Sequence, residues 1–85
     1  METRVALIGI IIENTESVER INNILHQYRD VVIGRMGVPY RPKNISVISV
    51  CLDASDDVIN AISGKIGSLP GVTAKTVYSN VKCSS

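Results

Sequence analysis

The sequence predicts an α+β fold in which four strands form one antiparallel sheet and two helices lie on one face of it. Two runs rich in β-branched residues, 5–12 and 45–53, have the length and composition of central strands. Segments 15–28 and 55–69 instead repeat apolar residues at the spacing of amphipathic helices. A shorter strand after the first helix and a more polar one near the end complete a βαββαβ order. Right-handed crossovers interlock two such split units into a ferredoxin-like fold.

The composition fits one small globular domain. Of the 85 residues, 45% are hydrophobic and 20% are charged, and the formal net charge is +1. A charge this close to zero gives no general attraction to nucleic acid or to an acidic membrane. We expect a single domain over residues 1–79 and a flexible tail over residues 80–85.

The first strand is apolar on both of its faces. Within VALIGIII (5–12), Val5, Leu7 and Ile11 point one way, and the alternate residues point the other way. Eight residues are too few to cross a bilayer, which takes about 20. Acidic residues follow the run directly and no small-residue cleavage site appears, so we predict a strand and no signal peptide.

Each helix has a recognisable start and an apolar stripe. Asn14 and Thr15 supply polar side chains before the first helix, and Ser55 does so before the second. Pro70 and Gly71 stop the second helix. The two predicted stripes are Val18, Ile21, Ile24, Leu25 and Tyr28, and Val58, Ile59, Ile62, Ile66 and Leu69.

The remaining strands have the character of sheet edges. The strand at 30–37 contains two glycines, which suit a bulged edge, and residues 38–44 contain two prolines and are predicted to be a connection. The strand at 72–78 is the most polar, so we place it at the other edge. In the third strand, Ile48, Val50 and Leu52 share one face.

Two glycines near the end of the second helix suggest a close approach. The segment GKIG resembles the backbone-clamping loop of KH domains, but three residues before the next strand leave no room for the helix that follows such a loop. Gly64 and Gly67 share a helix face, and each costs about 1 kcal/mol relative to alanine in a helix interior. We expect them to pack closely against a neighbouring element or subunit, with a small ligand as the alternative.

No catalytic, metal or cofactor site is predicted. His26 is the single histidine, and the acidic residues cluster at helix starts, where the helix dipole explains them. Cys51 and Cys83 form no CxxC motif, so we expect both to be reduced and the protein to be cytoplasmic. The third strand carries no aromatic residue and the chain has no Phe or Trp, which excludes the strand-borne base-stacking of an RNA-recognition domain.

The segment 29–43 is locally basic, and we call it the basic stretch. It contains a single acid, Asp30, and four cations: Arg29, Arg35, Arg41 and Lys43. The simplest interpretation is a solvated hairpin. The alternatives are a docking surface for an anionic ligand or an acidic partner, and, less favoured, direct binding of nucleic acid.

Three segments carry a family resemblance over roughly residues 1–78: ILHQY, GRMGVPYRPKNISVISVCL and ISGKIGSLPGVTAKTV. They resemble the iron-only hydrogenase system regulators, stand-alone ACT-like domains akin to the C-terminal domain of nickel-responsive repressors. The resemblance implies an ACT-like ferredoxin fold, self-association and a regulatory role. One histidine cannot reproduce the histidine-rich nickel site of those repressors. Because the chain begins at its first strand, we expect a sensing or adaptor role rather than direct DNA binding.

The resemblance also implies where an effector would bind. ACT-like domains resemble one another in binding ligands near the first strand–helix turn, close to a subunit boundary. Here that turn is Glu13, Asn14 and Thr15, at a helix start suited to an anionic group. The alternative is a structural adaptor without a ligand.

A dimer or a tetramer is expected on physical grounds. The first and third strands are apolar on both faces, so whichever face the helices cover, the other retains apolar side chains that a second copy can bury. Another protein partner is also compatible with this surface. We expect no membrane association.

Overall fold

Four antiparallel strands and two helices make up the fold. It was obtained as a computed structural model that describes residues 2–83, with side chains described through residue 80. The elements are β1 (Thr3–Ile12), α1 (Ser17–Gln27), the 3₁₀ turn η1 (Arg29–Val31), β2 (Val32–Tyr40), the 3₁₀ turn η2 (Arg41–Lys43), β3 (Ile45–Ala54), α2 (Asp56–Gly67) and β4 (Val72–Cys83).

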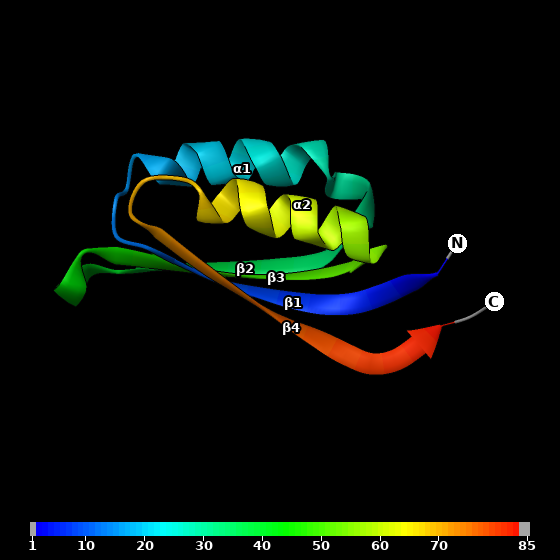
Figure 1. Ribbon diagram of the computed structural model, residues 1–85. Coiled ribbons are helices and arrows are strands. Elements are labelled where there is room, and N and C mark those ends of the chain that lie inside the picture. The colour runs from blue at the N-terminus through cyan, green and yellow to red at the C-terminus, as the bar shows by residue number, and fades with distance from the viewer. Residues whose placement is uncertain (1, 84–85) are drawn as a thin grey trace.

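The topology is the predicted one. The strands lie in the order β2-β3-β1-β4, each antiparallel to its neighbours, and both helices cover the same face of the sheet (Figure 1). The ferredoxin-like βαββαβ arrangement is therefore confirmed, including the placement of the second and fourth strands at the edges.

The core lies between the helices and alternate residues of the two central strands. We call this side of the sheet the covered face. On it, Ile8, Ile10 and Ile12 of β1 are fully buried. Ile8 and Ile10 lie in register with Val50 and Ile48 of β3, which are at most 4% exposed. The helices supply the opposing layer, whose fully or almost fully buried members are Ile21, Leu25, Ile59, Ile62 and Ile66. Both predicted apolar stripes therefore face the core, as expected.

The opposite side of the sheet carries a second set of apolar side chains without a covering layer. We call it the open face. Its exposed members on β1, β3 and β4 are Val5 (44%), Leu7 (40%), Ile11 (45%), Val47 (40%) and Val77 (65%). Strand β2 adds Met36, Val38 and Tyr40, which lie opposite Ser49, Val47 and Ile45 of β3.

Strand β2 is longer than predicted at its far end. It continues through Pro39 to Tyr40, so only η2 and Asn44 remain of the connection expected over 38–44. Proline is compatible with an edge strand such as β2, where alternate N–H groups face away from the sheet and make no ladder hydrogen bond. The predicted bulge is present, between Val32 and Gly34.

Strand β4 corrects the predicted tail. It runs to Cys83, and its end pairs with Thr3 and Arg4 at the start of β1. Residues 80–83 are therefore part of the sheet and not a tail, while residues 84 and 85 lie outside the described residues. The segment lacks a run of apolar residues, which suits an edge strand. For the same reason its sequence did not predict a strand.

Candidate functional site

The predicted effector turn, Glu13–Thr15, is held against the connection between α2 and β4. The Glu13 N–H donates to the Gly71 carbonyl at 2.7 Å, and the Ser17 hydroxyl donates to the Pro70 carbonyl at 2.7 Å. Gly71 has a φ of +68°, and a Cβ at this position would lie 2.7 Å from the Cβ of Asn14. The close approach that requires glycine in this part of the chain is thus at Gly71.

Several amide groups of this turn are already used within the chain. Besides Glu13, the Glu16 N–H donates to the Asn14 side chain, and the Ser17 and Val18 N–H groups donate to the Asn14 and Thr15 carbonyls. A hollow of about 90 Å³ lies beside the turn, with the acidic Glu16 among its lining residues. Binding of an effector at Glu13, Asn14 and Thr15 stays a prediction.

Gly64 and Gly67 have room for a side chain within the single chain. A Cβ at Gly64 would meet no atom within 4 Å, and one at Gly67 would make an ordinary 3.9 Å contact with Ala74. No neighbouring element of the described chain therefore requires glycine at these positions. Of the predicted roles, packing against a second subunit and contact with a ligand remain.

The structure divides the basic stretch into two groups. Arg29 lies in η1, before β2, and Arg35 within β2 donates to Asn22 of α1, whereas Arg41 and Lys43 lie in η2, which follows the other end of β2. The first group borders a cavity of about 290 Å³ between α1 and β2. We call it the α1–β2 groove; its lining residues are Asn22, Leu25, His26, Arg29, Val32 and Arg35.

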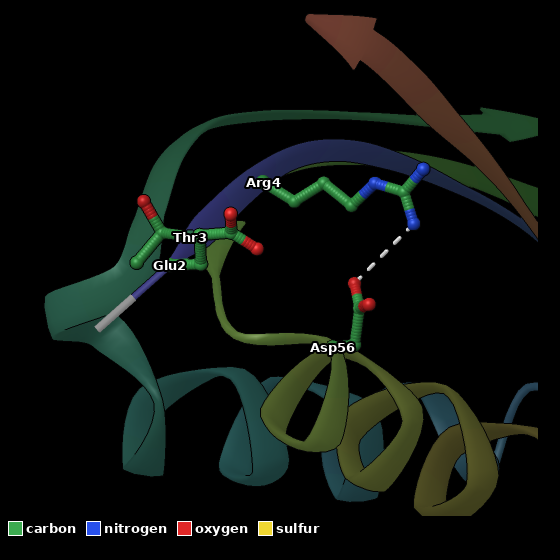
Figure 2. A pocket seen from close by; sticks show the side chains of 4 residues that line it. All are labelled: Glu2, Thr3, Arg4 and Asp56. Atoms are coloured by element: carbon green, nitrogen blue, oxygen red, sulfur yellow. Dashed lines mark hydrogen bonds and ion pairs between the residues drawn. The ribbon is translucent and has the colours of Figure 1, made fainter. Parts of the chain in front are cut away.

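A second charged cluster, which the sequence did not indicate, ties β1 to α2 (Figure 2). The Arg4 guanidinium lies 3.5 Å from the Asp56 carboxylate and 4.8 Å from the centre of the Tyr78 ring. Glu2 and Thr3 complete the rim of a hollow of about 160 Å³ at this point. Since Asp56 and Tyr78 already hold the Arg4 side chain, we interpret the cluster as a structural link between strand and helix.

Arg4 and Asp56 are 52 residues apart in the chain, so no local sequence pattern predicts their contact. A similar long-range contact joins the two helices, where the Lys65 ammonium donates to the Tyr28 hydroxyl at 2.8 Å.

The other candidate residues lie apart from one another. Among the side chains of residues 2–80, no group of three or more from His, Cys, Asp and Glu could hold a metal ion. Cys51 has a free thiol, half-buried on the open face, while the side chain of Cys83 lies outside the described ones. No helix in the described part of the chain is long and apolar enough to cross a membrane.

Comparison with known structures places the fold among small α+β domains. Protein TM1266 from Thermotoga maritima, described as uncharacterised, has a TM-score of 0.85 and 31% identity, over 89% of this chain and 96% of that chain. The C-terminal domain of MgtC from Mycobacterium tuberculosis follows with a TM-score of 0.71 and 10% identity, over 89% and 87% of the two chains. A formyltetrahydrofolate deformylase from Pseudomonas putida KT2440 has a TM-score of 0.66 and 12% identity, over 91% of this chain and 30% of that chain. The last two show the fold alone.

Comparison with protein families gives a more specific result. No curated protein matches the chain. A family model described as "TM1266-like: Iron-only hydrogenase system regulator, putative" matches residues 4–76. Since this match spans most of the chain, and the Thermotoga maritima protein agrees with it in sequence and fold, the chain belongs to the TM1266-like family of iron-only hydrogenase system regulators.

Proposed function

We propose that the protein is a non-enzymatic regulatory module of an iron-only hydrogenase system and that it acts as a homo-oligomer. The description of the family supports the regulatory role. The observation that carries the oligomeric state is the open face, where apolar side chains of all four strands are exposed together. A contiguous apolar surface of this kind is unusual on a monomer and is typical of an interaction surface.

The charge distribution on the open face favours a second copy of the chain as its partner. Among the described side chains, the strand register places two charged residues on this face, Asp53 opposite Val5 and Lys75 opposite Gly9. Asp53 lies near the end of β3 and Lys75 on the edge strand β4, so the centre of the face is uncharged. Such a face is complementary to itself, because two copies can bury their apolar centres together without burying an unpaired charge.

The free energy of burying the open face also favours association. Fully burying a Val, Leu or Ile side chain contributes roughly 1.5–3 kcal/mol, and the exposed members of the open face are about half accessible in the single chain. Several such side chains together can offset the loss of translational and rotational freedom on dimerisation. Two-fold symmetry is the commonest way to close such an interface, so we propose at least a homodimer.

The experiment that tests this function is complementation of a deletion strain. The host carries an iron-only hydrogenase, and its hydrogenase transcript and hydrogen evolution are measured with and without the gene. We expect the wild-type gene to restore both, whereas Val47→Glu, which places a charge at the centre of the open face, does not. Asn23→Glu adds the same charge on an exposed residue of α1 and is expected to complement.

Two outcomes would overturn the proposal. Unchanged hydrogenase output in the deletion strain would remove the regulatory role. Full complementation by a monomeric Val47→Glu protein would mean that regulation does not need the open face. Loss of a partner protein's activity without any change in transcript would favour the alternative, a structural adaptor.

A further inference from the structure

The α1–β2 groove brings together two guanidinium groups and an imidazole from three different elements. His26 on α1, Arg29 in η1 and Arg35 on β2 all line it, and no acidic residue does. Asn22 and His26 lie four residues apart on α1, so both project from the side of the helix that faces β2. The groove is therefore a concave surface with cationic and neutral hydrogen-bonding groups directed into it.

Neither guanidinium in the groove is neutralised by a carboxylate. Among residues 2–80, whose side chains are described, the one ion pair is that of Arg4 with Asp56. Arg35 donates instead to the amide oxygen of Asn22, and Arg29 donates to the His26 carbonyl at 3.1 Å. These bonds hold each guanidinium in place while leaving its other N–H groups able to donate to an anion.

A second, mainly apolar cavity continues from the groove. It has a volume of about 280 Å³, and it shares Asn22 and Arg35 with the first. Val18, Pro39 and Ile48 are among the residues that line it, and none of its lining residues is acidic. The first cavity is therefore the cationic one and the second is the apolar one. The hydrogen-bonded pair Arg35 and Asn22 borders both.

We infer that the α1–β2 groove binds a small organic anion, with a carboxylate or phosphate head between Arg29 and Arg35 and an apolar part directed toward Val18 and Ile48. Forked guanidinium groups suit the paired oxygens of either head group. The cavity volumes are at the lower end of the range for small-molecule sites, so the ligand is a compact metabolite rather than a nucleotide chain. This inference rests on the proposed regulatory function, since it names the chemical class of the effector.

The groove is better suited to an anion than the Glu13–Thr15 turn is. At the turn, several amide N–H groups already have acceptors, and the hollow is lined by the acidic Glu16 as well as by Arg20. In the groove, the cations have no acidic partner and an apolar surface adjoins them. The two sites lie near opposite ends of α1, so a binding experiment with residue resolution separates them.

The test is a titration of the ¹⁵N-labelled full chain followed by NMR. The probes are inorganic phosphate, butyrate and butyl phosphate, which separate the contribution of the head group from that of the apolar part. We expect saturable shifts at the amides of Asn22, His26, Arg29 and Arg35, with at least one four-carbon probe binding more tightly than inorganic phosphate. Arg29→Gln and Arg35→Gln should each weaken binding about tenfold or more, because each removes a charged hydrogen-bond donor.

The matched control is Arg41→Gln, which removes one positive charge at the far end of β2 and should leave the affinity unchanged. Equal weakening by Arg41→Gln, shifts that do not saturate, or shifts centred on Glu13–Thr15 would each overturn the inference. Sedimentation of Arg29→Gln and Arg35→Gln measures their oligomeric state, so that loss of ligand binding is distinguished from loss of the proposed assembly. An oligomer that binds none of the probes contradicts the groove alone, whereas a monomeric wild-type protein contradicts the proposed assembly.

Discussion

Ile10 and Ile11 are consecutive residues of β1, yet Ile10 is fully buried and Ile11 is 45% exposed. They differ in the face of the sheet to which they belong, because successive side chains of a strand point to opposite sides. The covered face gains its burial from α1 and α2, whereas the open face has equally apolar side chains and no layer above them. Folding of the single chain therefore accounts for the apolar residues of one face only, and we propose that association accounts for the other.

The largest expected difference between the two faces is in the free energy of unfolding. Ile10→Ala should lower it by about 2–5 kcal/mol, since it leaves a cavity beneath the helices. Ile11→Ala is the matched control one residue away and should cost about 1 kcal/mol or less in dilute protein, because its side chain is already half exposed.

Urea unfolding at low and high protein concentration measures both variants. The cost of Ile11→Ala should increase with protein concentration if the open face is an interface. Equal, concentration-independent costs for the two substitutions would contradict the distinction between the faces.

A smaller effect is expected at the connection that returns the chain from the helices to the sheet. Gly71→Ala should lower the free energy of unfolding by about 1–3 kcal/mol, because the residue has a φ of +68° and its Cβ would collide with Asn14. Gly64→Ala is the control within α2, where a Cβ meets no atom within 4 Å, and it should raise stability by up to about 1 kcal/mol.

Thermal unfolding measures the stability of both glycine variants, and sedimentation measures whether they associate. Loss of association in Gly64→Ala would show that the outer surface of α2 is an interface, which would weaken the case for the open face. An unchanged stability in Gly71→Ala would mean that the contact with Asn14 is relaxed at little cost.

The sequence was sufficient for the order of elements and for the pairing of residues into faces. Long apolar runs and helical stripes are local signals, and they predicted that Val5, Leu7 and Ile11 share a face and that Ile48, Val50 and Leu52 share another. Which of the two faces the helices cover was not predictable, because both sides of β1 and β3 are apolar. That choice depends on the tertiary arrangement of the helices.

The ends of the edge strands were less predictable. Residues 80–83 are polar enough to resemble a tail, and their place in β4 depends on pairing with Thr3 and Arg4 at the other end of the chain. Pro39 suggested a connection, although an edge strand tolerates it. A long-range contact decided the first case, and pairing of β2 with the next strand, β3, decided the second.

The candidate site was predicted in part. The basic stretch was visible in the sequence, but its division was not, since that requires knowing that Arg35 of β2 contacts α1 whereas Arg41 lies in η2, after β2 has ended. His26, the single histidine, gave no indication of a site in the sequence, because the two cations that line the groove with it come from η1 and β2. The sequence predicts close packing at Gly64 and Gly67, whereas within the chain the contact with Asn14 requires glycine at Gly71. Packing of Gly64 and Gly67 against a second subunit stays a prediction.

Sedimentation velocity of the wild-type chain at micromolar concentration tests the central claim, that the open face is a self-association surface, most directly. We expect a species of at least twice the 9.2 kDa of one chain, a 9.2 kDa species for Val47→Glu, and wild-type behaviour for Asn23→Glu. A wild-type protein that sediments at 9.2 kDa at every concentration, or a Val47→Glu variant that associates as the wild type does, would contradict the account.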